Sequence, residues 1–261
     1  MRFSVVDFLN ARPLTWGLLR EPPEGIEVSR DLPSACADKL ASGEADVGLI
    51  PSIEYQRIPG LRAIPSLGIA ASSEVRSVLL VSRVPRDLIA SVALDPASRT
   101  SAALVRILLE RRYGIRPRFI DGPSEDADAR LVIGDPALKT RVSGQVVLDL
   151  AAEWRAFTGR SFVFAFWAVR EGVDALEAER LVLWSRDRAR AEFPRLVREE
   201  AVETGLSEAV VEDYLRHSLH FELDRADFGG LELFYRLAAD AGLIGAARTI
   251  EFVPHGITLS R

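Results

Sequence analysis

Several polar side chains follow apolar runs in the sequence, at points where predicted strands end. Asn10 comes directly after SVVDFL, and its amide can both donate and accept hydrogen bonds. In open α/β sheets, small molecules bind beyond the carboxyl ends of the strands, where loops and helix N-termini offer free N–H groups. Asn10 could equally be a turn or helix-capping residue. The residue type alone leaves both interpretations open.

The segment Ser98–Ser101 (S-R-T-S) is the strongest candidate for holding an anion. It follows the predicted strand SVALD and opens a predicted helix. Hydroxyls and free amides at a helix N-terminus can hold a carboxylate, because each charge-assisted hydrogen bond contributes about 1.5–3 kcal/mol. Plain N-capping is the alternative that needs no ligand. The other strand ends of interest are Pro51–Ser52 and Gly134–Asp135. Ser77, at the start of the apolar strand in EVRSVLLVSR, is either a cleft hydroxyl or one that only satisfies a backbone group.

Motifs for other common chemistries are missing from the sequence. It contains no G-x-G-x-x-G, Walker-type, H-E-x-x-H or G-x-S-x-G pattern. His217 and His220 have helical ligand spacing, with Glu222 nearby, but a helix end also favours histidines through its dipole. Cys36 falls on the apolar face of a predicted helix and is interpreted as a packed thiol. We therefore predict no metal ion and no cofactor.

The composition indicates an ordered globular protein. The 261 residues are 48% hydrophobic and 27% charged, with a formal net charge of −5 at pH 7. That charge removes the long-range attraction on which binders of nucleic acid or anionic membranes rely, so we predict neither partner. One cysteine cannot form an internal disulfide, and the sequence opens with a strand pattern rather than a signal peptide. We expect a soluble, cytoplasmic protein; nothing in the sequence indicates its oligomeric state.

The spacing of apolar runs predicts two βαβ units. In the first unit, SVVDFL and ADVGLI are strands, and Pro33–Ser42 is a helix with proline in its first turn and Gly43 after its end. The second unit contains SVALD, a helix over Thr100–Arg112, RFID and ARLVIG. After Asp174 the chain is mostly amphipathic helix.

These units predict a bilobal α/β fold with a ligand cleft between the lobes. We expect the chain to cross between lobes near Ser82–Pro85 and again near Phe166–Arg170, because no flexible linker separates two tandem domains. Residues 1–83 and 168–261 would then form one lobe, and residues 84–167 would form the second, inserted lobe.

A series of motifs extends this interpretation. VDFLNARPLTWGL, LPSACADKLASGEADVGLIPSIEY, RSVLLVSR, DPASRTSAALVRILL and VIGDPAL occur in this order within about the first 170 residues. Together they resemble the chorismate dehydratase family of the futalosine route to menaquinone. The resemblance implies the fold of type 2 periplasmic binding proteins, a cytoplasmic location and a lyase that dehydrates chorismate to 3-[(1-carboxyvinyl)oxy]benzoate. The helical C-terminal third matches that family in character more than in motif.

The resemblance also assigns residues to roles. The family's cleft asparagine falls on Asn10, its cleft serine on Ser77 and its S-R-T-S segment on Ser98–Ser101, while Phe8 replaces the usual tyrosine. We hypothesise that the S-R-T-S segment holds one carboxylate and that Asn10 and Ser77 orient the reacting part of the ring. The predicted catalytic residues are Asn10 and Ser77, and the predicted substrate-binding residues are Ala11, Pro51, Ser52, Arg76, Ser98, Arg99, Thr100, Ser101, Gly134 and Asp135.

The general base and the exact activity have alternatives. Asp7, Glu54 and Asp135 are candidate bases, and a carboxylate of the substrate is the other. A sister family of the same pathway shares the fold and cleaves a larger futalosine-derived substrate with a cleft histidine, but no histidine precedes His217. A cytoplasmic solute-binding or sensor protein for a small anionic metabolite would have the same fold, since fold does not fix function.

Overall fold

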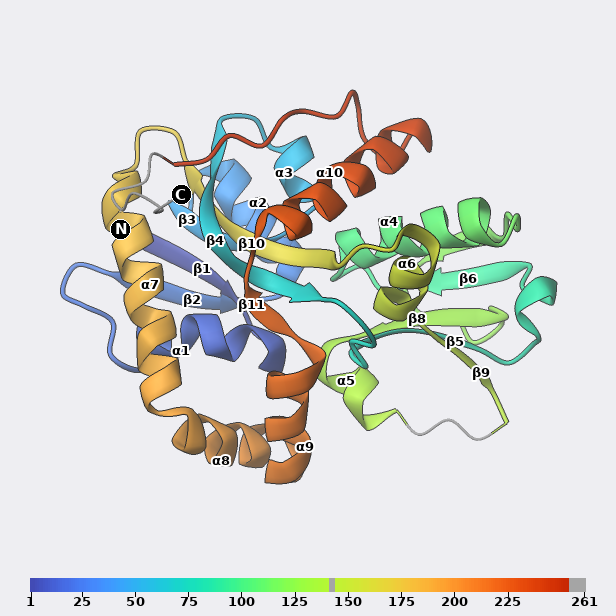
Figure 1. The fold of residues 1–261 in the computed structure, drawn as a ribbon, viewed down its shortest axis with the longest axis horizontal. Helices are drawn as coiled ribbons and strands as arrows, with labels where there is room; N and C mark the ends of the chain where they lie inside the picture. The colour runs from blue at the N-terminus through green and yellow to red at the C-terminus, as the bar shows by residue number, and fades with distance from the viewer. Residues whose placement is uncertain (141–143, 254–261) are drawn as a thin grey trace.

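Two β-sheets lie side by side in the protein, each covered by helices, as Figure 1 shows. The computed structural model describes residues 1–140 and 144–253. The first sheet has six strands in the order β11-β4-β10-β3-β1-β2. Parallel pairing joins β1 to β2 and β3, whereas β10 runs antiparallel to β3 and β4. Its strands are β1 (Arg2–Val6), β2 (Glu27–Asp31), β3 (Val47–Pro51), β4 (Leu61–Ala71), β10 (Phe162–Arg170) and β11 (His220–Glu222).

The second sheet has five strands in the order β7-β6-β8-β5-β9. The strand β6 is parallel to β7 and β8, and β5 is antiparallel to β8 and β9. This mixed α/β architecture with two sheets agrees with the predicted fold class. The strands are β5 (Val78–Ser82), β6 (Ser91–Leu94), β7 (Arg118–Asp121), β8 (Ala129–Ile133) and β9 (Val146–Asp149).

The chain passes between the two sheets twice, after β4 and after β9. It leaves the first sheet between Ala71 and Val78 and returns between Asp149 and Phe162. Strand β5 therefore belongs to the second sheet and β10 belongs wholly to the first. Both crossings lie nearer the N-terminus than Ser82–Pro85 and Phe166–Arg170, where we expected them.

Two helices show how far residues at the helix ends determine where a helix begins and ends. Helix α2 covers Pro33–Ser42, the predicted bounds, and Gly43 follows in the left-handed conformation at φ 82°. Helix α4 (Arg99–Ile107) has Ser98 as its N-cap and continues as a π-helical segment, η3, over Leu108–Arg112. The α-helix expected over Thr100–Arg112 thus changes its hydrogen-bonding pattern in its last turns.

The remaining helices cover the sheets and join them (Figure 1). Helix α7 packs along α1, and Gly17 makes this approach possible, because a Cβ there would lie 2.8 Å from the Cα of Ser185. Within residues 1–140 and 144–253, no helix is long and apolar enough to cross a membrane. The helices not yet given are η1 (Leu9–Ala11), α1 (Arg12–Arg20), α3 (Glu54–Arg57), η2 (Arg86–Leu88), α5 (Gly134–Lys139), α6 (Leu150–Thr158), α7 (Ala175–Ala191), α8 (Phe193–Thr204), α9 (Glu208–Asp213), η4 (Tyr214–Ser218) and α10 (Arg225–Asp240).

Candidate active site in the cleft between the sheets

A narrow cavity of about 50 Å³ lies where the strand ends of the two sheets face each other. The ends of β1 and β3 contribute Asn10 and Pro51, and the start of α4 contributes Ser98, Thr100 and Ser101. The side of the second sheet adds Ser77, just before β5, and Gly134, just after β8, next to apolar groups such as Phe8 and Phe164. We call this cavity the cleft. It brings together seven of the twelve predicted site residues: Asn10, Pro51, Ser77, Ser98, Thr100, Ser101 and Gly134.

Asn10 offers an unsatisfied hydrogen-bond acceptor to the cleft. It lies in the single turn η1, directly after β1, because the chain must turn from the strand into α1. Its Oδ1 atom is buried and has no hydrogen-bond partner among the described residues. A buried carbonyl oxygen without a partner costs about 1–3 kcal/mol, so the position favours a ligand that donates a hydrogen bond.

Ser77 is fully buried and held on both sides. Its backbone carbonyl accepts a hydrogen bond from the Gly134 N–H at 2.8 Å. Its Oγ accepts one from the hydroxyl of Tyr214 at 2.7 Å, and Tyr214 is itself buried. Burial raises the pKa of Tyr214 well above its ordinary value, so the phenol remains a donor. No motif in the helical C-terminal part had pointed to Tyr214.

The Ser98–Ser101 segment combines helix capping with cleft lining. The Ser98 Oγ accepts the Ser101 N–H at 3.4 Å and donates to the Ser101 Oγ at 2.7 Å. The Thr100 Oγ1 accepts the N–H of Ile53, 3.2 Å away on the first-sheet side. All three hydroxyl side chains are buried. The capping and the binding interpretations therefore coexist, because the same turn both starts α4 and faces the cleft.

Gly134 allows the two lobes to approach at the cleft. Its φ of 64° is left-handed, and a Cβ there would lie 2.9 Å from ring atoms of Phe8. The next residue, Asp135, accepts the backbone N–H of Leu9 at 3.0 Å. Burial raises the pKa of Asp135 above its usual range. Asp135 thereby ties α5 to the turn that holds Asn10, although it is not among the residues lining the cleft.

The two predicted arginines are not among the residues that line the cleft. Arg99 pairs with Asp38 at 2.8 Å and with Glu54 at 3.1 Å. Arg76 pairs with Asp213 at 2.8 Å, and its Nε donates to the Ser218 Oγ at 2.8 Å. Both guanidinium groups therefore join elements of the fold. Two further predicted residues do not line the cleft. Ala11 is fully buried, and the carbonyl of Ser52 accepts the hydroxyl of Tyr235 at 2.6 Å.

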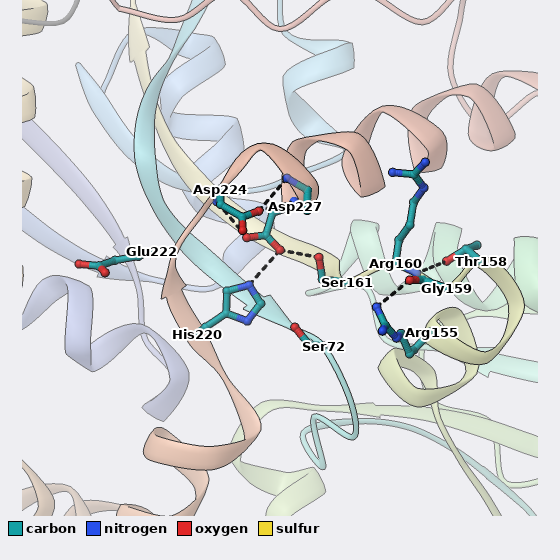
Figure 2. A pocket seen from close by; sticks show the side chains of 11 residues that line it. Ser72, Arg155, Thr158, Gly159, Arg160, Ser161, His220, Glu222, Asp224 and Asp227 are labelled. Carbon is teal, nitrogen blue, oxygen red and sulfur yellow. Dashed lines mark hydrogen bonds and ion pairs between the residues drawn. The ribbon is translucent and has the colours of Figure 1, made fainter. Parts of the chain in front are cut away.

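A second, larger cavity of about 650 Å³ is lined by His220 (Figure 2). There His220 Nε2 lies 2.9 Å from Asp227 Oδ1, and Ser161 donates to the same oxygen. Asp227 also accepts the backbone N–H of Asp224 at the start of α10. These groups satisfy one another and fasten α10 to the start of β10. His217 lies apart, 70% exposed, beside Asp213.

Comparison with solved structures identifies the fold. A protein of Archaeoglobus fulgidus superimposes with a TM-score of 0.77 at 17% identity, over 93% of this chain and 98% of that one. The periplasmic aliphatic sulphonate binding protein of Escherichia coli follows with a TM-score of 0.63 at 15% identity, over 100% and 96% of the two chains. The fold is therefore that of the periplasmic binding proteins, as the sequence motifs implied.

Sequence comparison identifies the family. The chorismate dehydratase of Thermus thermophilus is 30% identical over 237 residues, which cover 81% of this chain and 86% of that protein. The chorismate dehydratase of Campylobacter jejuni is 32% identical over 171 residues, 63% of this chain and 66% of its own. A family model described as menaquinone biosynthesis matches residues 1–240. This chain belongs to that menaquinone biosynthesis family.

Proposed function

We propose that this protein is a chorismate dehydratase, a hydro-lyase that converts chorismate to 3-[(1-carboxyvinyl)oxy]benzoate on the futalosine route to menaquinone, in the cytoplasm. The two curated relatives bear the name of this activity. The observation that supports it most in the structure is the unpartnered Oδ1 of Asn10, which shares one cleft with Ser77 and the N-terminus of α4.

The chemical needs of the reaction match the groups in the cleft. Chorismate carries two carboxylates and a ring hydroxyl. We assign one carboxylate to the N-terminus of α4, where hydroxyls and the helix dipole favour negative charge. The ring hydroxyl would donate to Asn10 Oδ1 and accept from the Ser77 hydroxyl, so that a hydrogen-bond donor faces the oxygen that leaves.

A substrate carboxylate is the base in this proposal. Glu54 pairs with Arg57 and Arg99, and Asp7 is hydrogen-bonded to Arg12 and Arg30. Burial opposes ionisation of Asp7, but those two arginines outweigh it and lower its pKa, which makes it a weak base. Neither side chain, nor Asp135, is among the residues that line the cleft.

The bond changes then balance within the substrate. The ring C–H bond breaks, its electron pair enters the ring, and the C–O bond breaks with its pair on oxygen. The carboxylate takes the ring proton and then transfers it to the departing hydroxide, so the products are water and an aromatic ring. Aromatisation supplies the driving force, and the protein supplies orientation and a preorganised donor.

Incubation of the purified protein with chorismate tests the proposal. We expect the ultraviolet absorption of the cyclohexadiene to disappear as an aromatic product forms. Calorimetry with the same sample measures binding. Tight binding of chorismate without any product would contradict the dehydratase and favour a sensor or solute-binding protein of the same fold.

A further inference from the structure

We propose that Tyr214 is a positioning residue for this reaction: its hydroxyl fixes Ser77 so that the Ser77 proton is directed into the cleft. The inference rests on the proposed function and deepens it, because it assigns a role to the helical C-terminal part of the chain. Tyr214 is not among the residues that line the cleft, so any effect must pass through Ser77.

The hydrogen bond between the hydroxyls of Tyr214 and Ser77 is short and buried. The Tyr214 hydroxyl donates to Ser77 Oγ at 2.7 Å, and both residues are buried, at 1% and 0% exposure. A serine hydroxyl has one proton and two acceptor lone pairs. Since Tyr214 occupies a lone pair as donor, the Ser77 proton remains available for an acceptor in the cleft. Without Tyr214, the serine hydroxyl could rotate and keep its proton for a protein group.

Tyr214 lies in the segment Asp213–Ser218, which also binds the side chain of Arg76, the residue before Ser77. It opens the π-helical segment η4, and such segments are frequent at functional sites. Arg76 lies over the Tyr214 ring, 5.8 Å from its centroid, and binds Asp213 and Ser218 on either side of it.

The backbone at Arg76 shows that this arrangement is imposed on the chain. Its φ is 62°, in the left-handed region that is uncommon for residues other than glycine. The Arg76 N–H donates to Asp149 at 2.6 Å, which stabilises this conformation. The segment from Asp213 to Ser218 therefore holds both the side chain of Arg76 and the hydroxyl of Ser77.

Tyr214 acts by orientation rather than by giving up its proton. Burial raises its pKa well above the ordinary value, and Asp135 and Asp149 add to the effect, whereas Ser77 and Arg76 oppose it. A tyrosinate at this place would be a buried anion facing two carboxylates. The phenol therefore keeps its proton throughout the cycle, and the departing oxygen receives the ring proton through the substrate carboxylate.

A double-mutant cycle tests this role, with Tyr214→Phe, Ser77→Ala and the double variant assayed on chorismate. We expect Tyr214→Phe to lower kcat about tenfold or more and to leave KM nearly unchanged, since one aligned hydrogen bond is lost from the transition state. In the Ser77→Ala background, the same change should have no further effect. Tyr55→Phe is the matched control, because that buried hydroxyl accepts the Glu251 N–H in the first lobe and Tyr55 does not line the cleft.

Crystal structures of the wild type and Tyr214→Phe give a readout that does not depend on turnover. We expect one Ser77 rotamer in the wild type and a changed or divided rotamer in the variant. Equal kcat for wild type and Tyr214→Phe, additive losses in the double variant, or an unchanged rotamer would each overturn the inference. A wild type that does not dehydrate chorismate would instead refute the proposed function, and the Ser77 rotamers would still decide whether Tyr214 positions this hydroxyl.

Discussion

Asn10 is the only asparagine in the chain, and its amide oxygen has no hydrogen-bond partner among the described residues. Residue types and strand-end positions predicted that Asn10 and Ser98–Ser101 would lie together, because strand carboxyl ends and helix N-termini converge in this class of fold. Ser77 was placed beside them only by the family resemblance. Tyr214 escaped prediction, since its partner Ser77 is 137 residues away in the sequence. Arg76 and Arg99 were predicted as substrate ligands from their neighbours, but the structure pairs both with protein carboxylates. Their proposed contact with substrate has no support from this geometry.

The proposed substrate-carboxylate base leads to a prediction about two protein carboxylates. Asp7→Asn and Glu54→Gln should each retain chorismate turnover within a few-fold of the wild type, because both carboxylates already form ion pairs with arginines. Steady-state kinetics and calorimetric binding check this. If either amide variant bound chorismate normally and formed no product, that residue would be the base and the substrate-carboxylate mechanism would be wrong.

The helices and strands that position these residues differ in how clearly the local sequence predicts them. Helix α2 was predictable to the residue because Pro33 and Gly43 mark its ends. Strand β4 is not evident in the sequence, since Pro65 and Gly68 interrupt its apolar pattern and its pairing with β10 contains register shifts. Strand β5 was assigned to the wrong side of a crossing, because a short apolar run does not reveal which sheet it joins.

The close approach at Gly134 leads to a prediction about α5. Gly134→Ala should lower the free energy of unfolding by about 1–2 kcal/mol through its left-handed φ. It should also lower kcat, because the new Cβ displaces Phe8 beside the turn that holds Asn10. Gly205→Ala is the matched control: its φ is 68°, but a Cβ there meets nothing within 4 Å. Denaturation and kinetics of both variants check this, and equal kcat for the two would contradict the role of Gly134.

Asp227, which fastens α10 to β10, leads to a prediction about acid stability. Burial alone would raise its pKa, but hydrogen bonds from His220 and Ser161 outweigh burial and lower it. A carboxylate with a lowered pKa stabilises the fold above its unfolded pKa, and this contribution is lost as the pH falls through the folded value. Asp227→Asn should therefore unfold more easily at neutral pH and lose less stability on acidification than the wild type.

Denaturation at a series of pH values measures this difference. Asp240→Asn, an exposed change on the same helix, serves as the control and should keep the wild-type dependence. An Asp227→Asn curve parallel to that of the wild type would show that this carboxylate does not contribute to acid unfolding.

At the scale of the whole molecule, polar contacts join the two sheets around the cleft. Thr100 accepts from Ile53, Asp135 from Leu9, and Arg99 pairs with Asp38 and Glu54. The bilobal class was predictable from two βαβ patterns and from the motif series. The exact crossings were not, because they depend on long-range strand pairing that periodicity does not encode. We expect these contacts to stabilise the arrangement of the two lobes around the cleft.

Loss of one such contact should weaken substrate binding without changing the chemistry. Arg99→Ala should raise KM about 2- to 5-fold at constant kcat, because a partly exposed ion pair contributes up to about 1 kcal/mol. Arg116→Ala is the control, since its ion pair with Glu110 lies on the surface of the second lobe. Kinetics on chorismate check both variants. An unchanged KM for Arg99→Ala, or a large fall in kcat, would contradict this role of the Arg99 ion pairs.

The most direct test of the account compares wild type and Asn10→Ala for chorismate dehydration, with product identified by mass spectrometry and proton NMR. The account predicts that the wild type releases a product lighter by one water and carrying new aromatic protons. It also predicts that Asn10→Ala stays folded, binds chorismate and forms that product at least about 100-fold more slowly, the usual effect of losing a preorganised hydrogen bond to the reacting group. A wild type that binds chorismate unchanged, or an Asn10→Ala variant with full turnover, would contradict it.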